Sequence, residues 1–164
     1  MLKKVYVETT IPSFYHNQRT EAEMVAVMHW TRTWWDTHRL AYDVVSSTAV
    51  LDELRQGEHP QKAEKTAMLR NIPLLDVTQE VLEIVEVYIA HKLMPGDRSG
   101  DALHLALASR HNCDILLTWN CVHLANANKV RHIQRVNALL GLSSPVLATP
   151  LQLMEAPDDS GTGN

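Results

Sequence analysis

The chain has 164 residues, of which 45% are hydrophobic and 21% are charged, so its composition indicates one globular domain and excludes disordered, collagen-like and coiled-coil proteins. Lysine and arginine total 15 and aspartate and glutamate total 19, a formal charge of -4, which excludes a protein that coats nucleic acid through bulk positive charge. Since no apolar run approaches the roughly 18 residues of a membrane span and no signal-like leader opens the sequence, we expect a cytoplasmic protein without a membrane partner.

Short apolar runs alternate with helical patterns along the chain. In chain order we expect a strand at 5–7, a polar loop at 8–12, a helix from about 21 to 39, a strand at 42–47, two short helices separated by Gly57, a strand at 73–77, a helix after Thr78, a helix from about 100 to 111, a strand at 114–118, a helix from about 128 to 140 and a strand at 145–149. Ser47 or Thr48 is expected to cap the helix that leaves the second strand, and Thr78 the helix that follows the third.

This alternation predicts the fold class. Strands of a few residues that are separated by helices favour right-handed crossovers and a parallel sheet with both faces covered. We therefore expect an α/β protein of three α/β/α layers, with a central parallel sheet of about five strands. One domain is expected over 1–155, and the polar tail at 156–164 is expected to be disordered.

Four polar residues are placed where such a sheet binds ligands, beyond the carboxyl ends of its strands. Glu8 follows the first strand, Glu53 lies on the helix after the second, Asp101 opens the helix before the fourth, and Asn120 follows the fourth. Simpler roles exist for three of them: Asp101 favours the helix macrodipole, Glu53 suits a solvated helix face, and Asn120 suits a turn. A carboxylate at the end of a buried strand, by contrast, needs hydrogen bonds or a cation.

Grouped together, the three acids indicate a metal site. Carboxylates within about 4 Å of one another repel by several kcal/mol at an effective dielectric constant of about 20, so the cluster requires a cation or raised pKa values. Oxygen ligands suit Mg²⁺ or Mn²⁺, and such a metal promotes in-line displacement at a phosphodiester. The predicted reaction is metal-assisted phosphodiester hydrolysis.

Four stretches of the sequence resemble the PIN-domain ribonucleases, most closely the VapC-type toxins of type II toxin-antitoxin pairs. They occur in the family's order, at residues 5–13 (VYVETTIPS), 50–54 (VLDEL), 100–106 (GDALHLA) and 114–120 (DILLTWN). The resemblance implies a PIN fold and an acidic cluster that holds Mg²⁺ or Mn²⁺ for endonucleolytic cleavage of RNA.

The resemblance also assigns roles to single residues. Glu53 and Asp101 match the family's second and third acids, whereas Glu8 stands where the family usually has Asp and Asn120 where it commonly has a further acid. The implied catalytic set is therefore Glu8, Glu53, Asp101 and Asn120, with the metal held by the three acids. Expected supporting residues are Thr9, Thr118 and His104.

Partners are expected from the same resemblance. It implies an RNA substrate and a small antitoxin, and together with the Met- and Trp-rich segment at 24–35 it suggests a homodimer. Helical spacing favours core or interface packing over RNA stacking for Trp30, Trp34 and Trp35. A basic patch at Lys129, Arg131 and Arg135 is either an RNA-steering surface or a solvated helix face.

Other functions fit the sequence less well. A zinc site of His111, Cys113, Cys121 and His123 is disfavoured, because a strand between the cysteines separates them by about 20 Å. Phosphorylation receivers require a lysine after the fifth strand, and no lysine follows Lys129. The main alternative is a PIN scaffold, weakened by Asn120, that binds RNA or a protein without cutting.

Overall fold

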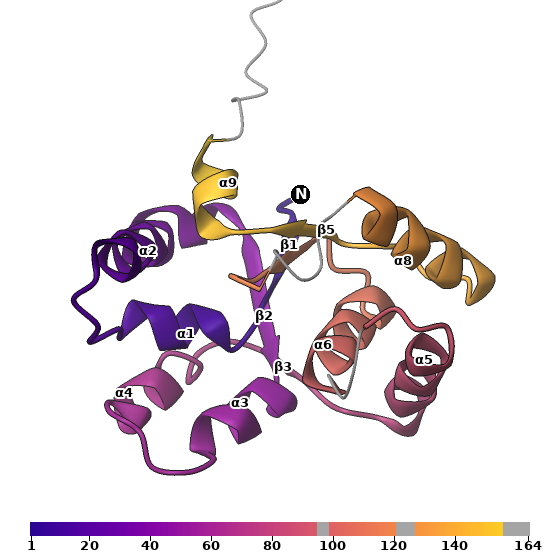
Figure 1. Ribbon diagram of the computed structural model, residues 1–164, viewed down its shortest axis with the longest axis horizontal. Helices are drawn as coiled ribbons and strands as arrows, with labels where there is room; N and C mark the ends of the chain where they lie inside the picture. Colours follow the sequence, from indigo (N-terminus) through magenta and orange to yellow (C-terminus); the bar gives the residue numbers. More distant parts are fainter. Residues whose placement is uncertain (95–98, 121–126, 156–164) are drawn as a thin grey trace, which may run out of the picture.

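A parallel sheet of five strands forms the centre of the molecule in the computed structural model, which describes residues 1–94, 99–120 and 127–155 (Figure 1). The strands are β1 (Lys4–Val7), β2 (Asp43–Ser47), β3 (Leu74–Leu75), β4 (Ile115–Leu117) and β5 (Val146–Ala148). All neighbouring strands pair in parallel, in the order β3-β2-β1-β4-β5. The predicted fold class is thereby confirmed, while the tail at 156–164 lies outside the described residues.

Helices cover both faces of this sheet (Figure 1). Their bounds are α1 (Thr10–Tyr15), α2 (Ala22–Thr33), η1 (Trp34–His38), η2 (Arg39–Ala41), α3 (Thr48–Arg55), α4 (Lys62–Ala67), α5 (Gln79–Ala90), α6 (Ser99–Arg110), α8 (Ala127–Leu139) and α9 (Pro150–Glu155). Helices α5, α6 and α8 lie on one side, and α1, α2 and α9 on the other. None of the described helices is long and apolar enough to cross a membrane.

The strand order places a ligand-binding crevice beside β1. From β1 the chain proceeds to β2 and β3 in one direction and later returns to β4 and β5 on the other side, so the direction reverses between β1 and β4. Tyr6 pairs with Val45 of β2 and with Leu116 of β4, which makes β1 the central strand. Open α/β sheets bind ligands at such a switch point, beyond the carboxyl ends of the strands.

Two apolar cores result from the alternation of side chains along β1. Val5 and Val7 pack with Ile11 and Trp34 on one face, whereas Tyr6 joins the larger core under α5 and α6 on the other. All five are fully buried. Each buried aliphatic side chain contributes about 1.5–3 kcal/mol, so the central strand and the residues that follow it are held firmly.

The structure differs from the sequence-based prediction in three elements, one of which is helix α9 (Pro150–Glu155), where the sequence analysis predicted no element. The loop predicted at 8–12 is wrong, because α1 begins at Thr10 directly after the site residues. The helix predicted from 21 to 39 ends as α2 at Thr33 and continues as a π-helical turn, in which the adjacent Trp34 and Trp35 are both buried. The predicted caps are confirmed, since Ser47 accepts a hydrogen bond from Val50 N and Thr78 accepts one from Val81 N.

Cys113 is a buried free thiol, and burial raises its pKa to about 11. A thiol in that state is a poor zinc ligand because metal binding requires the thiolate. The disfavoured zinc set also includes Cys121 and His123, which lie outside the described residues.

Candidate metal centre

Glu8 lies at the carboxyl end of β1, where its backbone N–H still donates to Leu117 O of β4 at 3.2 Å. Its side chain is buried, with 5% exposed. Three donors converge on Oε2: the hydroxyl of Thr10 at 2.6 Å, the hydroxyl of Thr118 at 2.7 Å and the backbone N–H of Thr10 at 3.2 Å. These bonds fix the carboxylate and compensate for the water that it loses on burial.

The same two threonines join the segment after β1 to the segment after β4. The Thr10 hydroxyl accepts a hydrogen bond from Trp119 N at 2.9 Å, and the Thr118 hydroxyl accepts one from Asn120 N at 3.0 Å. The turn at Asn120 is therefore closed by the threonine hydroxyl. Asn120 itself is half-buried at the edge of the sheet that carries Glu8.

Glu53 reaches this edge from α3, because the Ser47 cap starts that helix directly at the end of β2. Its Oε1 accepts a hydrogen bond from His104 Nε2 at 2.8 Å, and its Oε2 accepts one from the Thr9 hydroxyl. Burial raises the pKa of Glu53, but the bond and charge of His104 and the bond from Thr9 outweigh burial and lower it overall. Glu53 is therefore ionised at neutral pH, and about a third of its side chain is exposed.

His104 lies on the buried face of α6, with 2% exposed. Burial lowers the pKa of its imidazole, but the hydrogen bond to Glu53 and the negative charges of Glu8, Glu53 and Asp101 outweigh burial, so the pKa is raised. The other ring nitrogen, Nδ1, lies 2.7 Å from the Tyr6 hydroxyl, which lies 2.7 Å from the Ser47 hydroxyl. A buried chain of hydrogen bonds thus holds the imidazole in place against Glu53.

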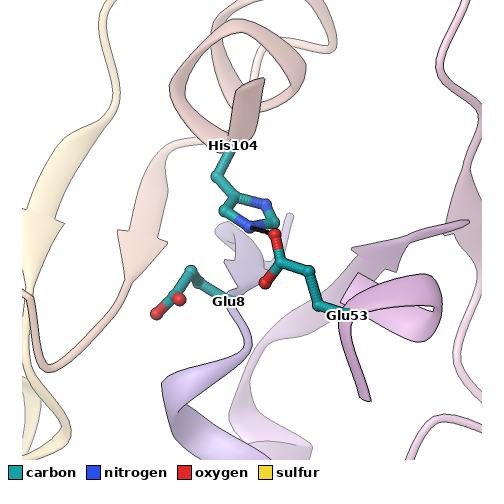
Figure 2. Close-up of side chains that lie close together, drawn as sticks. All are labelled: Glu8, Glu53 and His104. Carbon is teal, nitrogen blue, oxygen red and sulfur yellow. Dashed lines mark hydrogen bonds and ion pairs between the residues drawn. The ribbon is translucent and has the colours of Figure 1, made fainter. Parts of the chain in front are cut away.

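The two carboxylates and the imidazole form one constellation (Figure 2). Glu8, Glu53 and His104 each offer a ligand atom, and these atoms lie within 4.8 Å of one another. They come from β1, α3 and α6, which are far apart in the sequence. Two carboxylates suit Mg²⁺ or Mn²⁺. In this arrangement both ring nitrogens of His104 are engaged, by Glu53 and by Tyr6, so the imidazole positions Glu53 rather than offering a free lone pair. The residues present therefore fit a divalent cation.

Asp101 lies in the first turn of α6, three residues before His104, and is half-buried. It is not a member of the three-residue constellation, although its charge acts on His104. The first turn of α6 approaches Glu53 closely, since a Cβ built at Gly100 lies 3.6 Å from Glu53 Oε1. Asp101 is thus placed next to the constellation, and its role as a metal ligand stays a prediction.

Comparison with protein-family models finds no match, and comparison with curated proteins finds none either. Solved structures do match. A chain of FitAcB from Neisseria gonorrhoeae has a TM-score of 0.55 at 13% identity, covering 90% of this chain and 98% of its own. A chain of VapBC2 from Rickettsia felis, solved with a DNA fragment from the promoter, has a TM-score of 0.51 at 13% identity, covering 89% and 98%. The protein has a PIN-like fold.

Within this PIN-like fold, the structure brings together most of the residues singled out from the sequence. Glu8 and Glu53 meet at one edge, and all three expected supporting residues contact them: Thr9 and His104 bond to Glu53, and Thr118 bonds to Glu8. Of these, His104 links β1 to a carboxylate, because its ring bonds to Tyr6 of β1 through Nδ1 and to Glu53 through Nε2.

The sequence analysis did not identify three further residues of the site. Thr10 bonds to Glu8, Tyr6 bonds to His104, and Ser47 bonds to the Tyr6 hydroxyl. A usable signal existed for Tyr6, because a tyrosine inside a buried strand needs a partner for its hydroxyl. Thr10 offered none, since a threonine after a strand has no spacing that identifies its partner.

Proposed function

We propose that the protein is a Mg²⁺- or Mn²⁺-dependent endoribonuclease and the toxin of a VapBC-type toxin-antitoxin pair. The observation that supports this most is the convergence of Glu8, Glu53 and His104 at the switch point of a PIN-like sheet. Asp101 is proposed as a third acidic ligand and Asn120 as a residue that contacts the metal or its water. The motif resemblance in sequence and the similarity to chains of VapBC2 and FitAcB support the family assignment.

In the proposed mechanism the acids hold the cation and the surrounding hydroxyls hold the acids. Thr10 and Thr118 orient Glu8, while Thr9 and His104 orient Glu53, so both carboxylates are pre-positioned before the RNA binds. A bound divalent cation would polarise the scissile phosphodiester and stabilise the leaving oxygen. The exposed third of the Glu53 side chain would provide the access that a phosphate requires.

The function is tested by RNA cleavage with purified protein. We expect single-stranded RNA to be cut internally in Mn²⁺ or Mg²⁺, the cutting to stop in excess EDTA, and activity to return when the metal is restored. A Glu53→Gln preparation purified in parallel controls for contaminating ribonucleases. If the wild type binds RNA but leaves it intact with either metal, the alternative scaffold function replaces this proposal.

Asn120 supplies a separate prediction about metal affinity. An amide oxygen is able to coordinate Mg²⁺ but carries no charge to offset the cation, so we expect a metal requirement in the millimolar range. Asn120→Asp is expected to tighten metal binding without changing the cleavage products. A calorimetric metal titration of both proteins measures this, and unchanged or weaker binding would place Asn120 outside the metal shell.

The proposed partners follow from the same assignment. An antitoxin peptide with apolar anchors and a cationic side chain would neutralise the acidic centre. The structures named VapBC2 and FitAcB, whose chains have a similar fold, support the choice of this class of partner. A homodimer and a cytoplasmic location are proposed with it. Light scattering that finds a monomer at every concentration would contradict the dimer, and harmless expression without an antitoxin would contradict the toxin role.

A further inference from the structure

A cavity of about 540 Å³ lies beyond the far end of α1, between α1, the start of α2 and α4. Residues that line it include Ser13, Phe14, His16, Arg19, Met24 and Lys65. Its volume falls in the range of small-ligand sites. The described lining contains two cationic side chains and no aspartate or glutamate, so the cavity is positive in a protein whose formal charge is -4.

The cationic side chains of this cavity differ in how they are held. Lys65 is half-buried, its Nζ lies 3.2 Å from His59 Nδ1, and burial lowers its pKa. Arg19 is exposed and only its backbone is fixed, by Asn17, whose side chain accepts from Arg19 N at 3.0 Å and donates to Arg19 O at 3.1 Å. Within the described part of the chain, no carboxylate forms an ion pair with either cation. Cations gathered in a cavity without counter-ions favour an anionic ligand.

His16 adds an unsatisfied polar atom to the same cavity. Its Nε2 is buried and, among the described residues, has no hydrogen-bond partner. Burial lowers the pKa of the imidazole, and the positive charge of Arg32 lowers it further, so the ring is neutral at pH 7. A buried ring nitrogen without a partner is destabilising, and a hydrogen bond from a polar ligand that reached it would offset that cost.

Helix α1 connects this cavity to the candidate metal centre. Ser13, in the lining, donates its hydroxyl to Thr9 O at 2.9 Å, and Thr9 bonds to Glu53. Ser13 therefore lies about one helical turn, or ~5 Å along the helix axis, from Thr9, the residue of α1's start that bonds to Glu53. Phe14 lines the cavity on one side and meets the ring of Trp119 edge-on, with centroids 6.3 Å apart, on the other. Helix α1 thus contributes residues both to the neighbourhood of the metal centre and to the cavity.

We propose that this cavity is a nucleotide-binding subsite for the RNA strand, in which Arg19 and Lys65 bind the phosphate of a nucleotide near the scissile bond while Phe14 and Met24 contact its base. The proposal rests on the proposed ribonuclease function and specifies how the substrate is held beyond the metal centre. It assigns the cavity to a nucleotide, because its apolar lining gives a base a surface that free phosphate would not use.

Nucleotide binding is tested without any cleavage by following the His16 ring signals in NMR. We expect uridine 5′-monophosphate to shift these signals at several-fold lower concentration than inorganic phosphate, and Lys65→Gln to remove the response to both. Equal responses to the two compounds would reduce the cavity to a plain anion site and overturn the assignment. No response of His16 to either compound would also overturn it.

RNA binding is measured by fluorescence anisotropy with a labelled single-stranded oligonucleotide in EDTA, which prevents metal-dependent cutting. Lys65→Gln and Arg19→Gln are each expected to weaken binding about 3- to 10-fold and to reduce the slope of log K against log salt by about 0.7. Lys62→Gln is the matched control. It removes a positive charge from the same helix, α4, but Lys62 lines a different cavity, so we expect this variant to bind RNA as tightly as the wild type.

The outcomes separate this subsite from the proposed ribonuclease function. If the wild type cleaves RNA while Lys65→Gln binds it as tightly and with the same salt slope, the subsite is refuted and the ribonuclease function stands. A Lys62→Gln effect equal to that of Lys65→Gln would refute the subsite in favour of a net-charge effect. If no metal supports cleavage but the Lys65 and Arg19 effects are seen, the ribonuclease function fails and the cavity stands as an RNA-binding site of a non-cleaving scaffold.

Discussion

Glu53→Gln is expected to lower the rate of RNA cleavage by roughly a hundredfold or more while leaving the fold intact. The substitution keeps the size of the side chain and its place between Thr9 and His104 but removes the charge that a divalent cation requires. Cleavage rates at saturating Mn²⁺ measure the loss, and circular dichroism and thermal unfolding confirm that the protein is folded. Asp101→Asn is expected to act in the same direction.

Asp52→Asn is the matched control for Glu53→Gln. Asp52 is the preceding residue of α3, is exposed, and loses the same single charge, so its variant is expected to cleave within about twofold of the wild type. A Glu53→Gln enzyme with wild-type activity would mean that the centre is misassigned. Equal losses in both variants would indicate that net charge near α3, rather than coordination, controls the rate.

Trp34→Ala is expected to destabilise the protein by about 3–5 kcal/mol, the range for truncating a large buried aromatic side chain. Trp34 is fully buried in the core formed by Val5, Val7 and Ile11, and its ring lies 5.7 Å from that of Tyr42. This core supports β1, the strand that Glu8 directly follows. Urea unfolding followed by circular dichroism gives the difference in unfolding free energy.

Trp30→Ala is the control for that experiment because Trp30 lies on the same helical stretch but is 36% exposed. It loses a stacked contact with Trp119, whose ring centroid is 6.3 Å away, and we expect a cost of about 1 kcal/mol or less. Equal destabilisation by the two substitutions would contradict the division of the tryptophan cluster into two buried members and one exposed member.

The sequence was sufficient for the fold class and for all five strands of the sheet, because hydrophobic runs and helical periodicity are local signals. It failed at α1, where Thr9 is placed as the helix cap but makes no capping bond from its side chain. The Thr9 hydroxyl bonds to Glu53 instead, a residue 44 positions away. A local capping signal is lost when the side chain that would provide it is used in a tertiary contact.

The same distinction holds for the candidate site. Acidic residues at strand ends are visible in the sequence, and the parallel sheet brings Glu8 and Glu53 to one edge as expected. Asp101 and His104 are one helical turn apart, so their spacing alone gives both access to that edge. Only the rotation of α6 against the sheet decides that the imidazole meets Glu53, because this rotation is set by packing of the whole helix on the core and not by any residue of the motif.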